Sequence, residues 1–241
     1  DLGAYDLTVN GITVGKGNSA ISTNTAVGVD ALTSNTTGSY NTANGTRTLR
    51  QNTTGYQNTA NGYEALYYNT TGYINTANGW RALYSNTAGS QNTANGYSAL
   101  YRNTTGSNNT ANGREALSHN TTGNNNVANG NYALEFNTTG NYNTANGHQA
   151  LNSNTTGGNN IATGYRALNS NTTGSNNTGI GYQANVSSNN LTNATAIGNG
   201  ATVAASNRIQ LGNTSVTNVK TSGTITAGAI TIPNTDGTAN Q

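Results

Sequence analysis

A single 17-residue unit recurs along most of the chain, and its strict period constrains the fold more than any other feature. The unit reads N-T-A-N-G-x-x-A-L-x-x-N-T-T-G-x-x. The pentad glycine recurs at this spacing from Gly28 to Gly198, and the N-T-T-G glycine follows it from Gly38 to Gly174. Phasing without an insertion is typical of repeat architectures, in which equivalent residues of successive units stack in columns.

A unit with two glycine turns predicts one solenoid coil of two short strands and two turns. Glycine at both corners would supply positive φ angles that other residues adopt only with strain. Helical repeats need about 30 residues, and Asn, Thr and Gly are poor helix formers. A three-sided β-helix would need about 18 residues per coil, which fits less well. We therefore predict an all-β fold, a parallel β-roll.

Composition excludes several other classes of protein. Charged residues make up 7% of the chain, the formal net charge is +2, and Pro233 is the only proline, whereas disordered chains are rich in both charge and proline. The absence of cysteine excludes disulfides and thiolate-bound metals. No apolar run reaches the ~20 residues of a membrane span, and the sparse positive charge argues against nucleic acid. We expect no cofactor and no membrane insertion.

Three columns are expected to stabilise the roll, and neighbouring coils should lie about 4.8 Å apart. They are a leucine column, an asparagine column and an alanine column that leaves room for close backbone approach, comprising Ala26, Ala43, Ala60, Ala77, Ala94, Ala111, Ala128, Ala145 and Ala162. The leucine column comprises Leu32, Leu49, Leu66, Leu83, Leu100, Leu117, Leu134, Leu151 and Leu168. The asparagine column comprises Asn44, Asn61, Asn78, Asn95, Asn112, Asn129 and Asn146. Because Val27, Ile180 and Ile197 replace asparagine in the second column, we predict that it faces inward and forms amide ladders.

The core predicted in this way is thin, with one leucine and two alanines per coil. Burying a leucine contributes about 1.5–3 kcal/mol, which is less than the entropic cost of ordering a whole coil. Packing several chains around a shared axis would bury more apolar surface. We therefore expect a homo-oligomer.

The two flanks of the repeat carry a resemblance to known fibres. After Gly198 the glycine step shortens, in A-T-A-I-G-N-G-A-T-V-A-A-S-N-R-I-Q-L-G (Ala194 to Gly212). This segment resembles the left-handed parallel β-roll of YadA-type trimeric adhesin heads. The opening V-N-G-I-T-V-G-K-G (from Val9) resembles the start of the repeat region in phage tail-fibre-like proteins. The ending from Arg208 to Gln241 resembles segments that lead into an intramolecular chaperone domain.

This resemblance implies a homotrimer, a surface location and a role in attachment. We expect an N-terminal entry segment at 1–23, solenoid repeats at 24–213 with a 14-residue last coil, and a C-terminal trimeric transition segment at 214–241. The expected function is that of a non-enzymatic spacer or head in an extracellular filament, either a virion tail fibre or a cell-surface fibre. N-T-A-N-G replaces the apolar A-I-G of the family, which implies a more polar interior.

Aromatic residues are concentrated in a few coils and form a candidate receptor surface. Tyr63, Trp80 and Tyr97 share one slot of the repeat, and a second slot holds Tyr67, Tyr84 and Tyr101. Such rows could contact a cell-surface glycan or a receptor protein through apolar faces and hydroxyl groups. The same rows could instead stabilise the coils by cross-strand packing. Sequence alone leaves both interpretations open.

Charged residues point to register and not to chemistry. Asp30, Arg47, Glu64 and Arg81 share one slot and alternate in sign, so stacked neighbours should attract one another. The two histidines, His119 and His148, occupy different slots, and no acid accompanies them in the pattern of a triad. A calcium-binding β-roll would need an aspartate in every repeat. We predict no catalytic residue and no metal site.

Ice binding is the alternative function from another class. A threonine column could order water on a flat face of the roll. Its members are Thr36, Thr53, Thr70, Thr104, Thr121, Thr138, Thr155 and Thr172. Because neighbouring residues of a strand point to opposite faces, the N-T-T turn would not present paired threonines. The resemblance of the flanks favours the fibre.

Overall fold

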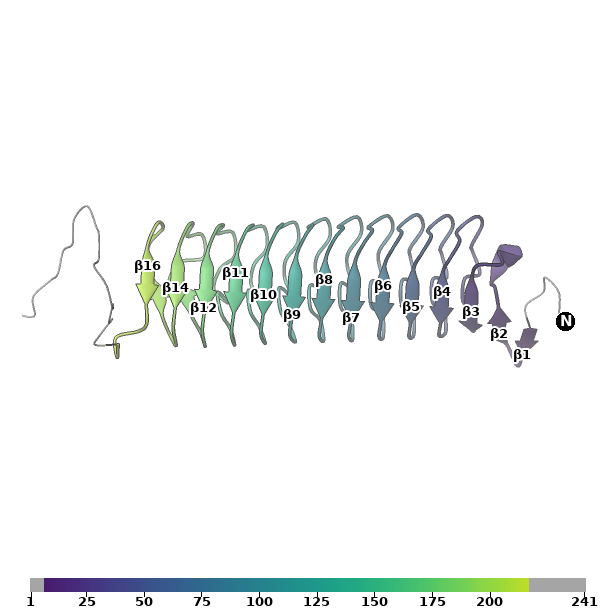
Figure 1. Cartoon of the computed structure of the whole chain (residues 1–241), viewed down its shortest axis with the longest axis horizontal. Coiled ribbons are helices and arrows are strands. Elements are labelled where there is room, and N and C mark those ends of the chain that lie inside the picture. The colour runs from purple at the N-terminus through teal and green to yellow at the C-terminus, as the bar shows by residue number, and fades with distance from the viewer. Residues whose placement is uncertain (1–6, 217–241) are drawn as a thin grey trace, which may run out of the picture.

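The computed structural model describes residues 7–216 and shows a single row of stacked coils (Figure 1). A 14-stranded sheet runs along the row in the order β1 to β12, then β14 and β16, while β13 and β15 form a separate pair. From β3 onward every pair in the large sheet is parallel, and the register usually joins equivalent residues of successive units, as in Ala43 with Ala60. The prediction of an all-β fold with a parallel solenoid of 17-residue coils is confirmed.

Each coil contributes one short strand to the large sheet. The elements are β1 (Leu7–Val9), β2 (Ile12–Gly15), η1 (Asn18–Ala20), β3 (Thr25–Gly28), β4 (Thr42–Asn44), β5 (Thr59–Asn61), β6 (Thr76–Asn78), β7 (Thr93–Asn95), β8 (Thr110–Asn112), β9 (Val127–Asn129), β10 (Thr144–Asn146), β11 (Ile161–Thr163), β12 (Thr178–Ile180), β13 (Asn185–Val186), β14 (Thr195–Ile197), β15 (Thr202–Val203) and β16 (Ile209–Leu211). We call the side of the roll formed by β3–β12, β14 and β16 the strand wall.

The opposite side of the coil, which we call the turn wall, departs from the prediction of two strands per coil. It comprises the x-x-A-L-x-x segments that follow each pentad and, near the end, β13 and β15. In the regular coils two of its residues take positive φ, such as Glu64 at 55° and Leu66 at 52°, and this conformation interrupts an extended strand. Backbone hydrogen bonds still join neighbouring coils on this side. The backbone nitrogen of Leu66, for example, donates to the carbonyl oxygen of Ala82 over 3.0 Å.

The apolar part of the core lies between the two walls. Every leucine of the predicted column, from Leu32 to Leu168, is fully buried, and so is the central alanine of strands such as β5 and β6. At Gly179, which replaces that alanine in β12, an added Cβ would lie 2.7 Å from Cγ of Leu168. The leucines therefore face the strand-wall alanines, and the small alanine lets the two walls approach closely.

Two columns of asparagine fill the other part of the interior, and neither is the predicted one. One column comprises Asn35, Asn52, Asn69, Asn86, Asn103, Asn120, Asn137, Asn154 and Asn171. The other comprises Asn24, Asn41, Asn58, Asn75, Asn92, Asn109, Asn126, Asn143, Asn160 and Asn177. All are almost completely buried. Their amides bond along the roll, as from Asn69 to Asn52 over 2.7 Å, and to turn carbonyls, as from Asn69 to Gly72 over 3.0 Å.

The predicted asparagine column points outward from the strand wall, so its expected inward orientation is wrong. Strand residues alternate between faces, and the buried central alanine leaves both of its neighbours on the outer surface. Amide ladders do form there, with bonds of 2.7–2.9 Å linking the members from the second onward. The members are Asn44, which is exposed, and the half-buried Asn61, Asn78, Asn95, Asn112, Asn129 and Asn146.

The second glycine of each coil is required for a different reason from the one predicted. Gly55 lies outside the left-handed region, but an added Cβ would sit 2.5 Å from the carbonyl oxygen of Gly72 in the next coil. The pentad glycine combines both demands, since Gly62 has a φ of 128° and its Cβ would lie 2.5 Å from the carbonyl oxygen of Gly79. Close stacking of neighbouring turns therefore selects glycine at both places.

The first coil is covered by a hairpin. Strands β1 and β2 are antiparallel and are joined by Asn10 and Gly11, which have φ angles of 49° and 81°, as a two-residue Asn-Gly turn requires. Strand β2 then pairs antiparallel with β3. The hairpin thereby occupies an edge of the sheet that would otherwise be open to other strands. This hairpin and η1 lie within the predicted entry segment, 1–23.

At the far end the coil shortens as predicted. Thr178 pairs with Thr195, one full unit further along the chain, whereas Thr195 pairs with Ile209 after a shorter, 14-residue step. The buried residues of the turn wall change here to Val186 and Val203. Most of the predicted transition segment, from residue 217 onward, lies outside the described residues.

Candidate functional site

The repeat period stacks the predicted aromatic residues into two ladders on the outside of the roll. In the first ladder the ring centroids of Tyr63 and Trp80 lie 6.4 Å apart, and those of Trp80 and Tyr97 lie 4.6 Å apart at an interplanar angle of 5°. Spacings of this size are favourable for aromatic pairs. The coil-to-coil register therefore places each ring over the next one.

The second ladder is built in the same way. Tyr84 stacks on Tyr67 at 5.4 Å and on Tyr101 at 5.2 Å. Tyr68 adds an edge contact to the ring of Tyr84 at 5.1 Å. Burial, followed by a hydrogen bond with Tyr68, raises the pKa of Tyr84 to about 12. Tyr84 is therefore the anchored centre of this ladder.

Arg81 connects the two ladders. Its guanidinium carbon lies 4.3 Å from the ring centroid of Trp80 and 5.2 Å from that of Tyr84. The guanidinium also donates to Glu64 over 2.8 Å, which holds it in place. Cation–π contacts of this kind join the rows into one surface. We call this surface the aromatic ridge, comprising Tyr63, Trp80, Tyr97, Tyr67, Tyr84 and Tyr101.

The stacking geometry decides which parts of the aromatic ridge a ligand can reach. The ring of Trp80 lies between Tyr63 and Tyr97, with Arg81 beside it, so its faces are occupied. Tyr63 and Tyr97 remain 38% and 46% exposed. Ring edges and hydroxyl groups are therefore available, whereas stacking on a sugar ring at Trp80 is not. The stacked inner rings pack one coil against the next. Only the outer ring edges are free to contact a partner.

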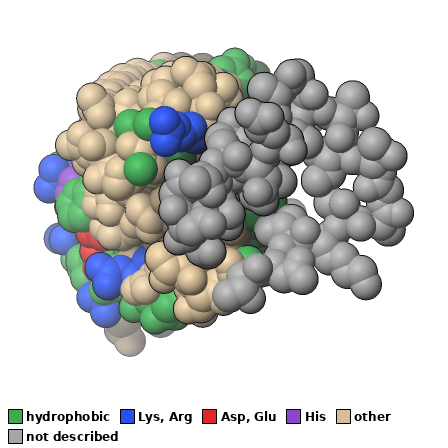
Figure 2. All heavy atoms as spheres, turned by 90° about the vertical axis from the view of Figure 1, so that its left-hand side faces the viewer, with side chains coloured by type: hydrophobic (Ala, Val, Ile, Leu, Met, Phe, Trp, Pro, Cys, Tyr) green, Lys and Arg blue, Asp and Glu red, His purple; other side chains and the backbone are tan. Residues whose placement is uncertain are grey.

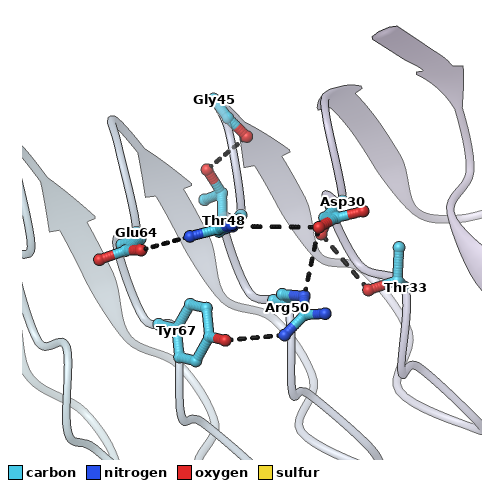
Figure 3. A network of polar contacts seen from close by, with 8 residues as sticks. Asp30, Thr33, Gly45, Thr48, Arg50, Glu64 and Tyr67 are labelled. Atoms are coloured by element: carbon cyan, nitrogen blue, oxygen red, sulfur yellow. Dashed lines mark hydrogen bonds and ion pairs between the residues drawn. The ribbon is translucent and has the colours of Figure 1, made fainter. Parts of the chain in front are cut away.

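The charged column forms the predicted alternating ladder beside the aromatic ridge (Figure 3). Arg47 approaches Asp30 at 4.0 Å and Glu64 at 3.2 Å, and Glu64 also pairs with Arg81. Arg50 reaches Asp30 at 3.4 Å and donates to the hydroxyl oxygen of Tyr67 over 2.7 Å. The prediction that stacked charges attract is confirmed, and the charges are tied to the aromatic rows.

Glu64 is the buried member of this ladder, with a side chain that is 5% exposed. Burial by itself would raise the pKa of Glu64. Hydrogen bonds from Arg81, Tyr63 and Arg47 outweigh that effect and lower the pKa below its usual value. The hydrogen bond with Glu64 in turn raises the pKa of Arg81, so both partners remain charged at neutral pH.

The histidines lie apart from each other. Nδ1 of His119 lies 3.0 Å from the hydroxyl oxygen of Ser118, but Ser118 is only 4% exposed. His148 stacks on Tyr165 at 5.5 Å. Within residues 7–216 no group of three His, Cys, Asp or Glu side chains is placed to hold a metal ion. In the end-on view, tan predominates on the coloured part of the surface, which marks backbone and side chains that are neither hydrophobic nor charged, and Lys and Arg gather in a few places (Figure 2).

The threonine column considered for ice binding forms hydrogen bonds between neighbouring coils. Hydroxyl groups of this column donate to the threonine carbonyl oxygen of the next coil, as from Thr53 to Thr70 over 2.9 Å and from Thr121 to Thr138 over 3.0 Å. The following residue of each turn, such as Thr54 or Thr71, is exposed. The outward threonine row is therefore the neighbour of the predicted one.

A second aromatic row was not singled out from the sequence. His148, Tyr165 and Tyr182 stack at 5.5 Å and 5.1 Å, and Tyr132 meets His148 edge-on. The sequence does contain a pattern that predicts this row, because Tyr165 and Tyr182 occupy the same position of the repeat as Tyr63. The intervening Arg114 and Asn131 interrupt the row in the sequence, and this obscures its continuity.

Comparisons of the chain with protein-family models, curated proteins and solved structures found no match. The part of the chain that the structure describes contains no long apolar helix suited to crossing a bilayer. The class is therefore defined by the fold: this chain is a parallel β-solenoid repeat protein.

Proposed function

We propose that the chain is a non-enzymatic, rigid segment of an extracellular fibre, on a virion or a cell surface, that spaces or presents an attachment site. The observation that carries this proposal is the unbroken stack of coils. The register is continuous from β3 to β16, and each coil bonds to the next through backbone, asparagine and threonine contacts. A rod held at every level resists bending, which is what a spacer requires.

The proposed assembly is a homotrimer of left-handed rolls, as in the adhesin heads that the flanks resemble. The outer surface of the strand wall supports self-association, because neither of its two outward columns contains a charged residue. Near its end it exposes Ile180, Ile197 and Leu211, which lie in register at 43%, 40% and 46% exposure. Depletion of charge and exposure of aliphatic side chains are typical of interface cores.

The assembly can be tested by sedimentation equilibrium and electron microscopy. We expect a mass about three times the 24.6 kDa of the chain and a rod with a solenoid section about 50 Å long. Ile180→Lys combined with Ile197→Lys should reduce the mass to that of one chain. Tyr182→Lys, which alters the turn-wall side of the same region, is the matched control and should leave the trimer intact. A monomeric wild-type protein would overturn the proposed assembly.

Attachment is assigned to the aromatic ridge, whose partner would be a cell-surface glycan or a receptor protein. The exposed edges of Tyr63 and Tyr97 and the fixed guanidinium of Arg81 support this assignment. Binding to a glycan array and to receptor-bearing cells should fall after Trp80→Ala combined with Tyr97→Ala. Unchanged binding by a folded double variant would show that the ridge only packs the coils.

Ice binding is the second candidate, and one observation favours it. The row containing Thr54 and Thr71 is exposed and repeats at the coil spacing, although Ala88 interrupts it. The neighbouring threonine hydroxyls already donate to carbonyl oxygens, which lowers their capacity to order water. Thermal hysteresis separates the two functions, because a fibre spacer should produce none.

A further inference from the structure

The turn wall contains a polar cavity of about 360 Å³ where the roll changes shape near its far end. Three successive coils line it. Arg166, Asn169 and Ser170 come from the first coil, and the later coils contribute Gln183, Asn185 and Thr202 among others. Cavities of this size fall within the range of small-ligand sites. We call this cavity the notch.

The notch follows from a change in the repeat. In register, the core position of Leu168 passes to Asn185, and Val186 becomes the inward residue instead. Strands β13 and β15 therefore replace the turns of the earlier coils. Two wall shapes meet at this point, and the step between them leaves space that the regular coils fill.

The floor of the notch is fixed by its own hydrogen bonds. The amide of Asn185 donates to the hydroxyl oxygen of Ser170 over 3.0 Å, and its oxygen accepts from the backbone nitrogen of Val186 over 2.9 Å. The backbone nitrogen of Ser170 also donates to that oxygen, over 3.2 Å. These bonds hold the lining groups in place before a ligand arrives, which favours binding.

Arg166 supplies an unused positive charge at this place. Within residues 7–216 its guanidinium has no ion pair, hydrogen bond or ring contact, whereas Arg47, Arg81 and Arg114 each pair with a carboxylate. The side-chain amide of Gln183, also in the lining, is likewise without a partner in this part of the chain. A forked cation beside free amide groups is suited to a carboxylate with neighbouring hydroxyls.

A second cavity of about 360 Å³ continues the notch toward the end of the roll. It shares Gly200 and Thr202 with the first cavity and adds Gln210 and Asn213. Amide and hydroxyl groups therefore line a path longer than a single small-ligand pocket. This extent fits a chain of sugar units better than one isolated ring.

We propose that the notch binds an acidic oligosaccharide, with a sugar carboxylate paired to Arg166 and sugar hydroxyls bonded to Gln183, Asn169 and Thr202. One unmatched positive charge corresponds to the single charge of a uronic-type carboxylate. The inference adds a second binding site to the one at the aromatic ridge, and it rests on the proposed attachment role for the choice of a glycan ligand. The notch lies away from the outer strand wall, so the proposed trimer would leave it open.

Calorimetric titration with tetragalacturonate as the probe tests this site. The wild-type protein should bind this probe. The affinity for the fully methyl-esterified probe should be lower by a factor of about ten, because esterification removes the charge. Arg166→Gln should weaken binding of the acid probe by a similar factor. Arg102→Gln is the matched control, because Arg102 is an exposed arginine outside the notch, and it should bind like the wild type.

Gln183→Ala keeps the test decisive if Arg166→Gln does not fold, and it should also weaken binding. Absence of wild-type binding, equal affinity for acid and ester, or equal loss in Arg102→Gln would each overturn the notch as an acidic-sugar site. Trimer mass and rod length are measured separately. Failure of the notch with an intact trimeric rod would therefore be distinguishable from failure of the proposed fibre role.

Discussion

The side-chain amide of Asn58 donates to the side-chain oxygen of Asn41 in the preceding coil over 3.1 Å and to the carbonyl oxygen of Gly72, in the second turn of its own repeat unit, over 2.9 Å. The backbone nitrogen of Asn58 donates to the same oxygen of Asn41 over 3.0 Å. The side-chain oxygen of Asn58 in turn accepts from the side-chain amide of Asn75 in the following coil over 3.1 Å, so one buried side chain links three coils. Since the bond types recur along the column, the asparagine part of the interior is held together by a polar network.

Asn75→Ala should destabilise the roll much more than Asn78→Ala. Asn75 is buried, and its oxygen accepts from the backbone nitrogen of Asn92, which would be left unpaired. We expect a loss of about 2–4 kcal/mol in the free energy of unfolding, against about 1 kcal/mol or less for the half-buried Asn78. Denaturant unfolding at matched concentrations measures both. Equal losses would contradict the assignment of the inner column as the structural one.

Gly55→Ala should disrupt the stack although Gly55 lies outside the left-handed region. The added Cβ would meet the carbonyl oxygen of Gly72, and backbone at this distance cannot move without separating the coils. Thr54→Ala is the matched control, because the exposed Thr54 shares a column with the natural Ala88. Hydrogen exchange should report opening of the adjoining coils in the glycine variant alone. Full protection in Gly55→Ala would refute the steric requirement.

Glu64→Gln should remove an acid-sensitive part of the stability. Because the pKa of Glu64 is lowered in the folded state, its contribution is fully present above the usual value of about 4.5 and is lost as the pH falls through the lower folded-state pKa. The variant should lose about 1 kcal/mol or less per ion pair at pH 7. Thermal unfolding from pH 7 down to pH 3 should therefore decline less steeply in the variant. Parallel pH profiles would show that Glu64 does not carry this dependence.

Tyr84 should ionise later than an ordinary tyrosine. Burial raises its pKa to about 12, so its contribution to stability is complete below the usual value of 10.0 and is lost as the pH rises toward 12. Ultraviolet titration of the wild type should contain a late component that Tyr84→Phe removes. Tyr142→Phe, at an exposed tyrosine, should leave that component in place. If both variants retained it, the late group would be another tyrosine.

The period predicted the architecture because stacked coils require equal lengths. The leucines were identified as one column because no other large aliphatic residue recurs. The predicted inward orientation of the asparagine column is wrong because substitution by an aliphatic residue does not require burial: Ile180 is 43% exposed. Columns such as those of Asn35 and Asn41, which do not vary from coil to coil, are the buried ones, because a ladder tolerates no gap. Variation within the repeat marks the surface.

The turn conformation and the notch could not be predicted from the repeat. Leu66 has a positive φ, a strained conformation that leucine ordinarily avoids. The residue type therefore does not predict this turn. The aromatic rows were located by slot, but only their ring spacings show that the faces of Trp80 are covered. The notch exists because two regular patterns meet, so it depends on the difference between coils and not on either pattern.

The constant 17-residue period stacks equivalent residues of successive coils, and a pair of matched deletions tests this most directly. Removing residues 92–108 deletes one complete coil and joins Gln91 to Asn109 in register. Removing residues 92–107 deletes one residue fewer and shifts every later column. Thermal unfolding should remain a single cooperative transition in the first variant, while the second should lose that transition or unfold far earlier. Equal stability of the two deletion variants would contradict the account.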